Sequence, residues 1–281
     1  MHNTQNFSYH THTNFSDGHC SLEDMVLQAK KIGFTEMGIS DHLIVHKNMH
    51  KNKSWTYLCK QKANHVYNSS FASILDLFKR HCEEVRYAAK KYNIKLYIGF
   101  EVDYFTYDGW EDELRWFLSQ LDYDYLHTGN HFFCEENCEN VINMAFFKQT
   151  CTDVGRYKEY VARHFDTMKQ AVESGLFKFL AHLDYVRRYG TDICGANDFM
   201  SEKLQVLDAL QKNNTAMEIS TKGLRKIGDF YPSASVLDEA AKRDIAFVIS
   251  DDAHKTEELG MDFEKAEAEL KKYGITKRLK F

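Results

Sequence analysis

Histidine and carboxylate residues stand at regular spacing near both ends of this sequence. His10 and His12 are separated by one residue, and Asp252 and His254 are spaced in the same way. Residues i and i+2 of a β-strand point to the same face, so each pair would aim two ligand atoms at one point. Imidazole and carboxylate groups together suit Zn, Mn or Fe. We interpret both pairs as candidate metal ligands, and Asp17, after the first pair, as a further group able to bind a metal.

Other residues of the same kind stand at the ends of further short apolar runs. Each alone would more often be an ordinary polar residue, as is expected for His127, but their recurrence at six of seven predicted strand ends favours a common function. Six histidines and three carboxylates exceed what one ion can use, so two or three ions are implied, with a bridging carboxylate such as Glu101. His19 is left open. The strand-end residues are His10, His12, Asp41, His42, Glu101, His131, His182, Asp252 and His254.

The alternation of apolar runs with helical patterns predicts how these residues are positioned. Runs typical of strands cover residues 7–13, 36–42, 95–105, 123–133, 178–186, 215–223 and 245–254. Helical patterns cover residues 21–34, 74–92, 154–175, 200–213 and 233–244. Seven strands that alternate with helices predict an α/β fold whose parallel sheet is closed or nearly closed into a barrel. The C-terminal strand ends of such a barrel meet at one mouth, where the candidate ligands would converge.

An open doubly wound sheet is the alternative architecture, but the Gly-rich phosphate loop typical of it is absent after the first strand. A length of 281 residues suits one barrel domain over residues 1–281. Residues 44–73 interrupt the alternation with a polar, basic and aromatic insertion that includes Trp55 and Tyr57. A segment of this length is usually a lid, a binding loop or disordered, and this one follows the second strand, on the mouth side.

The composition disfavours several classes of protein. Acidic residues outnumber basic ones by 41 to 36, for a net charge of −5, which does not suggest a protein that neutralises a nucleic-acid backbone. No apolar run approaches the roughly 18 residues needed to span a membrane, and no signal peptide is visible. Seven scattered cysteines indicate reduced thiols rather than a disulfide framework. We expect a cytoplasmic protein with a small-molecule partner, and leave its oligomeric state open.

A set of short motifs resembles a known family. The segments HTHTNFSDG, GISDH, GFEVDY, NHFF, AHLDYVR and ISDDAH, in that order between Phe7 and Lys255, resemble the PHP (polymerase and histidinol phosphatase) superfamily. The segments HLDYVRRYG, EISTKGLRK and SDDAHK are most similar to its histidinol-phosphatase branch. The resemblance implies a distorted (β/α)7 barrel, which is TIM-like, with a trinuclear metal site. It also implies hydrolysis of L-histidinol phosphate to L-histidinol and phosphate in histidine biosynthesis.

The resemblance also distributes nine ligands over three ions. It assigns to the first ion His10, His12, Glu101 and Asp252, to the second Glu101 as a bridge with His131 and His182, and to the third Asp17, His42 and His254. Glu101 and Asp252 would then be catalytic, around a hydroxide that bridges the ions, because coordination lowers the pKa of water toward ~7. Arg187 and Arg225, just past two strand ends, are expected to bind the substrate phosphate, with Arg188 as the adjacent alternative.

Three hypotheses on function follow. The first is a phosphomonoesterase acting on L-histidinol phosphate, and an acidic wall of Asp103, Asp108 and Glu111 could face the cationic amine of that substrate. The second is a PHP phosphoesterase acting on nucleotides or oligonucleotides, which the acidic balance of charges does not favour. The third is a metal-binding module without catalysis, which predicts a degraded ligand set, whereas all nine positions are filled.

Overall fold

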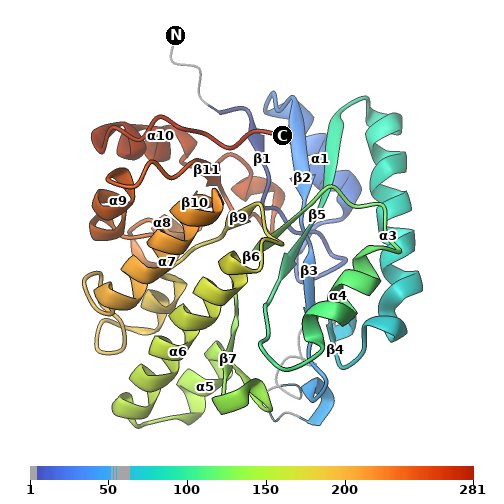
Figure 1. The fold of residues 1–281 in the computed structure, drawn as a ribbon. Coiled ribbons are helices and arrows are strands. Elements are labelled where there is room, and N and C mark those ends of the chain that lie inside the picture. Colours follow the sequence, from blue (N-terminus) through green and yellow to red (C-terminus); the bar gives the residue numbers. More distant parts are fainter. Residues whose placement is uncertain (1–4, 52, 54, 56–63) are drawn as a thin grey trace.

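The parallel sheet of this protein is the frame on which the candidate ligands stand. The computed structural model describes residues 5–51, 53, 55 and 64–281, so Tyr57 lies outside the described residues. The sheet contains a continuous path of parallel strands, in the order β1 (Phe7–Ser8), β2 (Glu36–Ile39), β5 (Lys95–Val102), β6 (Tyr125–Thr128), β9 (Phe179–Leu180), β10 (Ala216–Ser220) and β11 (Phe247–Ser250). A parallel bridge from Thr11 to Ala253 joins its two ends. The predicted α/β barrel, closed or nearly closed, is thereby confirmed (Figure 1).

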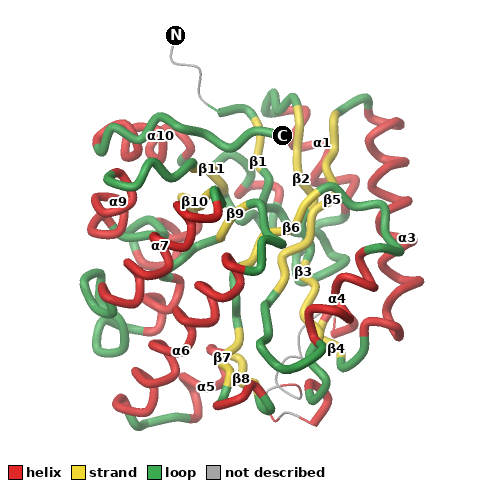
Figure 2. The backbone as a smooth tube through the Cα atoms, in the orientation of Figure 1, coloured by secondary structure: helices red, strands yellow, loops and turns green. Residues whose placement is uncertain are grey.

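Helices surround this sheet, as Figure 2 shows in red around the yellow strands. They are α1 (Leu22–Lys31), α3 (Phe71–Tyr92), α4 (Trp110–Leu118), α5 (Met144–Thr150), α6 (Val154–Glu173), α7 (Met200–Asn213), α8 (Lys222–Ile227), α9 (Ala234–Ala241) and α10 (Phe263–Lys272). The sequence patterns predicted α1, α3, α6, α7 and α9. They missed α4, α5, α8 and α10, of which α4 carried a readable signal, because Trp110, Leu114 and Phe117 repeat at helical spacing and are buried.

Two predicted strands are interrupted, which corrects their predicted extents. The run 36–42 divides into β2 and β3 (His42–Val45), and β3 pairs with the C-terminal end of β5. The run 123–133 ends as a strand at Thr128 and resumes in β7 (Phe132–Cys134), which forms an antiparallel hairpin with β8 (Val141–Asn143). Asn130 has a φ of 26°, and the Asp103 carboxylate accepts hydrogen bonds from the amides of His131 and Phe132. The chain therefore leaves the barrel ladder at this point.

The predicted insertion at residues 44–73 is shorter than expected at both ends. Residues through Val45 belong to β3, and α3 already begins at Phe71. Between them, single helical turns at Met49–Lys51 and Asn64–Val66 precede β4 (Tyr67–Asn68), which pairs with β3. The excursion thus returns Tyr67 to the sheet next to the mouth.

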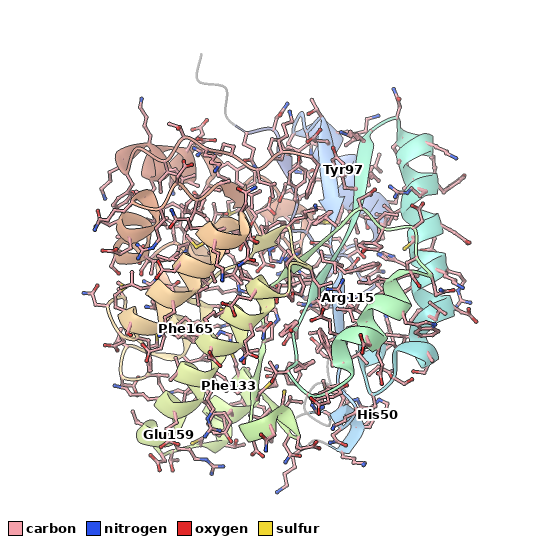
Figure 3. All side chains as sticks on the ribbon, viewed as in Figure 1. His50, Tyr97, Arg115, Phe133, Glu159 and Phe165 are labelled. Carbon is pink, nitrogen blue, oxygen red and sulfur yellow. The ribbon has the colours of Figure 1, made fainter. Side chains whose placement is uncertain are left out.

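Apolar packing holds the helices against the sheet and closes its other end. Phe133 of β7, labelled in Figure 3, packs against Tyr157 and His164 of α6. Its ring centroid lies 5.5 and 5.9 Å from theirs. At the N-terminal ends of the strands, Phe281 lies against Tyr9 and Tyr125, at 4.5 and 4.7 Å. The open end of the barrel is therefore the one at which the strands finish. Across the described part of the chain, no helix combines the length and the apolarity needed to cross a membrane.

Candidate metal centre

The nine residues that the family resemblance assigned to metal ions lie together at the C-terminal ends of the strands. Their ligand atoms form overlapping groups whose members lie within 4.8 Å of one another. The groups are His12, Asp17, His42 and His254; His10, His182 and Asp252; His10, His12 and Glu101; and His42, Glu101 and His131. His19, which the sequence left open, is exposed and belongs to none of these groups. The tertiary structure thus brings residues from both ends of the chain into one site.

The first group consists of the residues assigned to the first ion, His10, His12, Glu101 and Asp252, which have the spacing of ligands around one ion. The Nε2 atoms of His10 and His12 each lie 3.3 Å from Glu101 Oε2. The same two atoms lie 3.5 and 3.3 Å from Asp252 Oδ1. A tetrahedral zinc ion with bonds of about 2.0–2.1 Å separates its ligand atoms by about 3.3–3.4 Å. These four side chains therefore fit a single tetrahedral ion.

Glu101 directs its two carboxylate oxygens to different groups of imidazoles. Whereas Oε2 faces His10 and His12, Oε1 lies 3.0 Å from His182 Nε2 and 3.8 Å from His131 Nε2. Its side chain is 1% exposed, at the end of β5 in the middle of the parallel sheet. This is the arrangement in which one carboxylate can bridge two neighbouring cations.

The third group consists of the residues assigned to the third ion, Asp17, His42 and His254, and lies on the side of the site formed by the loop after β1. Asp17 Oδ1 is 3.4 Å from His42 Nε2 and 3.2 Å from His254 Nε2. The other ring nitrogen of His42 lies 3.1 Å from Glu101 Oε2, so His42 stands between this group and the first. The backbone amide of His19 donates to the His254 carbonyl at 2.7 Å, which ties the loop to the segment after β11.

Buried polar atoms without partners show that the site suits cations. Among the described residues, Nε2 of His10 and His12, Oδ1 of Asp17 and Asp252, and Nδ1 of His42 are buried and accept or donate no hydrogen bond. A buried polar group without a partner costs about 1–3 kcal/mol, so their convergence calls for a shared positive group. All five belong to nitrogen and oxygen types that bind Zn, Mn or Fe. The residues therefore fit the metal ions that the family resemblance implies.

The electrostatic setting keeps the carboxylates ionised. Burial opposes ionisation, yet the imidazoles of His10 and His131 hold the pKa of Glu101 well below its usual range. Burial also opposes ionisation of Asp252, whose pKa is held well below its usual range mainly by the ammonium group of Lys222. Lys222 Nζ lies 2.8 Å from Asp252 Oδ2, leaving Oδ1 for the first group. Sequence reasoning noted the cationic character of this segment but not this contact.

Two buried carboxylates that are not candidate ligands contact the imidazoles of His10 and His131 and so orient them. His10 Nδ1 lies 2.6 Å from Glu218 Oε1, a contact that sequence reasoning missed although a carboxylate inside the apolar run 215–223 was a usable signal. Asp103 was expected to line an acidic wall for the substrate, but it is fully buried and lies 3.0 Å from His131 Nδ1. Glu111 was expected there too, but it pairs with Arg115 on α4 at 2.6 Å. The acidic wall is therefore not formed as predicted.

Asp41 also stands apart from the ligand groups. Its Oδ1 and Oδ2 accept hydrogen bonds from the amide and the hydroxyl of Thr13, each at 2.8 Å, and the Ser16 hydroxyl donates to Oδ1 as well. His81 Nε2 lies 3.2 Å from Oδ2. Asp41 thus fixes the loop between His12 and Asp17 through its hydrogen bonds to Thr13 and Ser16.

The arginines near the mouth differ in what they contact. The Arg187 guanidinium lies against Asp184 at 3.4 Å, donates to the Phe230 carbonyl at 2.9 Å and pairs with Asp229. Arg188 instead lies 4.9 Å from the centroid of the Tyr185 ring and donates to its hydroxyl.

The contacts of Tyr185 and of Arg225 relate the arginines to the candidate ligands. The Tyr185 ring is 5.0 Å from that of His182 and 5.4 Å from that of His131. Arg225 donates to the Asp251 carbonyl at 2.5 Å, and its Nε–H is buried without a hydrogen bond among the described residues, 3.8 Å from the Glu258 carboxylate. Arg188 thus contacts a ring that borders the metal centre, and Arg225 contacts the residue before Asp252. The assignment of Arg187 and Arg225 to the phosphate stays a prediction.

Comparison with known proteins identifies the family of this chain. A family model for the PHP domain matches residues 8–222. The chain belongs to the PHP domain family. The match stops before β11, so Asp252 and His254 of this PHP domain lie beyond the matched residues.

Two proteins similar to this PHP domain have the same name. It is 26% identical over 270 residues to a protein of Thermotoga maritima named "Probable histidinol-phosphatase", covering 95% of this chain and 91% of that protein. It is 25% identical over 211 residues to a protein of the same name from Deinococcus radiodurans, covering 74% and 77%. A solved structure from Lactococcus lactis, a histidinol phosphate phosphatase complexed with Zn, L-histidinol and phosphate, superposes with a TM-score of 0.72 at 18% identity, covering 99% and 97%. That structure supports the fold.

Proposed function

We propose that this protein is a metal-dependent histidinol-phosphatase, which hydrolyses L-histidinol phosphate to L-histidinol and phosphate in histidine biosynthesis. The observation that carries the proposal is a complete set of nine candidate metal ligands at one mouth of the barrel. Both curated relatives have the same name, and one of them aligns with 95% of this chain. The filled ligand set does not favour a metal-binding module without catalysis.

We propose that two to three divalent transition metal ions, Zn, Mn or Fe, bind in the arrangement that the family resemblance implies. The ligand spacing around His10, His12 and Asp252 supports the first position. Ions bound here would supply Lewis-acid stabilisation of the phosphoryl oxygens and would lower the pKa of coordinated water toward ~7. Glu101 would join two positions and Asp252 would complete the first, which is why both are assigned to catalysis.

The chain's own cations would bind and orient the phosphate. Guanidinium groups bind phosphate oxygens in a bidentate manner. Arg188 lies over the Tyr185 ring, which borders His182, and Arg225 contacts the carbonyl of Asp251, next to Asp252. Lys222 adds a positive charge next to Asp252, and its side chain is only 16% exposed. Three fixed cations favour the dianionic terminal phosphate of a monoester over the single negative charge of a diester. The aromatic ring of Tyr185, beside His182, would exclude water from this side of the site.

We further propose that residues 1–281 act as one domain in the cytoplasm. β11 completes the barrel and leads into Asp252 and His254, so the site requires chain beyond the residues that the family model matches. Within the part of the chain that the structure describes, all six cysteines are free, as a reducing compartment would keep them. The partner would be a small phosphomonoester rather than nucleic acid or a membrane.

A phosphate-release assay over a panel of substrates tests this proposal. The panel would hold L-histidinol phosphate, sugar phosphates, a nucleoside monophosphate and bis-(p-nitrophenyl) phosphate, each with zinc- or manganese-loaded protein. We expect kcat/KM to be highest for L-histidinol phosphate, with Glu101→Ala as the matched inactive control. Comparable turnover of the diester would instead favour the alternative, a PHP phosphoesterase acting on nucleotides or oligonucleotides.

A further inference from the structure

Strand β10 contributes none of the nine candidate ligands, yet it places a carboxylate directly beneath them. Glu218, in the middle of β10, is fully buried. Its Oε1 lies 2.6 Å from His10 Nδ1, and its Oε2 accepts a hydrogen bond from the backbone amide of His182 at 2.8 Å. The hydroxyl of Ser250 on β11 also donates to Oε1. One carboxylate thus contacts candidate ligands of two different groups.

The contact with His10 selects the ring nitrogen that faces the metal centre. A carboxylate accepts but cannot donate, so the short Nδ1 contact places the ring proton on Nδ1. The lone pair of Nε2 then points toward Glu101 Oε2 and Asp252 Oδ1, at 3.3 and 3.5 Å. A carboxylate behind an imidazole ligand fixes its orientation and raises its basicity. Glu218 therefore prepares His10 for the first position.

The contact with His182 acts on the backbone instead. His182 has a φ of 26°, a conformation that non-glycine residues rarely adopt and that surrounding contacts must hold. Its amide donates to Glu218 Oε2, while its carbonyl accepts the amide of Tyr185 at 2.8 Å. This turn directs the ring so that Nε2 lies 3.0 Å from Glu101 Oε1. Glu218 therefore helps to hold the ligand of the second position as well.

We propose that Glu218 is a positioning residue shared by two metal positions, so that its loss weakens binding at both. The inference rests on the proposed metal site but not on the substrate. Asp103 offers a matched contrast, because it lies under His131 alone: its carboxylate contacts His131 Nδ1 at 3.0 Å and accepts the amides of His131 and Phe132. Both carboxylates are fully buried, so substitution of either removes a comparable buried charge.

Zinc titration of the metal-stripped full-length chain tests this proposal. Calorimetry and competition with a chromophoric chelator would give the number and affinity of sites in the wild type, E218Q and D103N. A carboxamide has one acceptor oxygen, so it cannot serve His10, His182 and Ser250 together. We expect two sites of E218Q to weaken by roughly 10- to 100-fold each and one site of D103N to weaken similarly. No phosphatase activity is measured, so failure of the proposed substrate leaves this result unaffected.

Several outcomes would overturn the shared role. An E218Q isotherm like that of the wild type, or one with a single weakened site, contradicts it. Equal loss of all sites in E218Q and D103N points to a general structural role and also contradicts it. Circular dichroism of the metal-free proteins checks folding, and E218D replaces E218Q if the latter does not fold. The shorter carboxylate keeps the charge but cannot span both contacts, so E218D must also weaken two sites.

Discussion

Truncation of the two neighbouring arginines, Arg187 and Arg188, would separate substrate binding from structural support at the mouth. The Arg188 guanidinium lies over the Tyr185 ring beside the metal centre. The Arg187 guanidinium is only 9% exposed and contacts Asp184 and Asp229. We therefore expect Arg188→Ala to lower kcat/KM for L-histidinol phosphate and Arg187→Ala to lower the free energy of unfolding.

The magnitudes follow from the contacts. A charge-assisted hydrogen bond to phosphate is worth about 1.5–3 kcal/mol, so loss of Arg188 should reduce kcat/KM by roughly 10- to 150-fold. Removal of one partner from a buried ion pair costs about 3–5 kcal/mol. For Arg187 we expect the lower end, about 3 kcal/mol, because its distance to Asp184 is a long 3.4 Å and Asp184 keeps the hydrogen bond from the Ser233 amide at 3.0 Å.

Two measurements on the same protein samples check this. Initial rates of phosphate release at low substrate concentration give kcat/KM, and urea unfolding gives the stability of each variant. Arg225→Ala is a second reference, with the same expected loss of kcat/KM as Arg188→Ala. The reasoning is refuted if Arg187→Ala loses kcat/KM at unchanged stability while Arg188→Ala behaves like the wild type. That outcome would support the interpretation from sequence, in which Arg187 binds the phosphate.

The remaining predictions concern metal content and pH. Active wild-type protein should contain more than one transition metal ion per chain, and chelation or Glu101→Ala should abolish activity; elemental analysis that finds one ion or fewer in active protein would contradict this. Burial lowers the pKa of His164 to about 3, so the unfolded chain takes up a proton below pH 6.5 while the folded protein does not. The free energy of unfolding should therefore fall by about 1.6 kcal/mol between pH 6.5 and 5 from this residue alone, and urea unfolding of metal-stripped His164→Phe should show a correspondingly shallower fall.

Much of the candidate metal site could be predicted because most candidate ligands stand next to a feature that is local in sequence. His10 and His12 follow strand periodicity, and Glu101 ends a long apolar run. The outer contacts had no local signal that identified their partners, although Glu218 stands out as a carboxylate inside an apolar run. Asp103 was expected to face the substrate, because a carboxylate just after a strand end is ordinarily exposed, and only the fold places it under His131. Glu218 was missed because its partners come from three other strands or their ends.

The sequence by itself determined the order of the seven barrel strands and of five of the helices between them, the barrel class and the chemical types gathered at its mouth. These follow from hydrophobic periodicity and from the convergence of parallel strand ends. Only the tertiary structure decided where strands break, as at Asn130, and which partners each arginine meets. The turn at Tyr185–Tyr189 places Arg188 over the Tyr185 ring and Arg187 against Asp184 and Asp229. Adjacent residues on such a turn have the same local pattern, so the buried partners that each one meets, rather than its neighbours in sequence, determine its role.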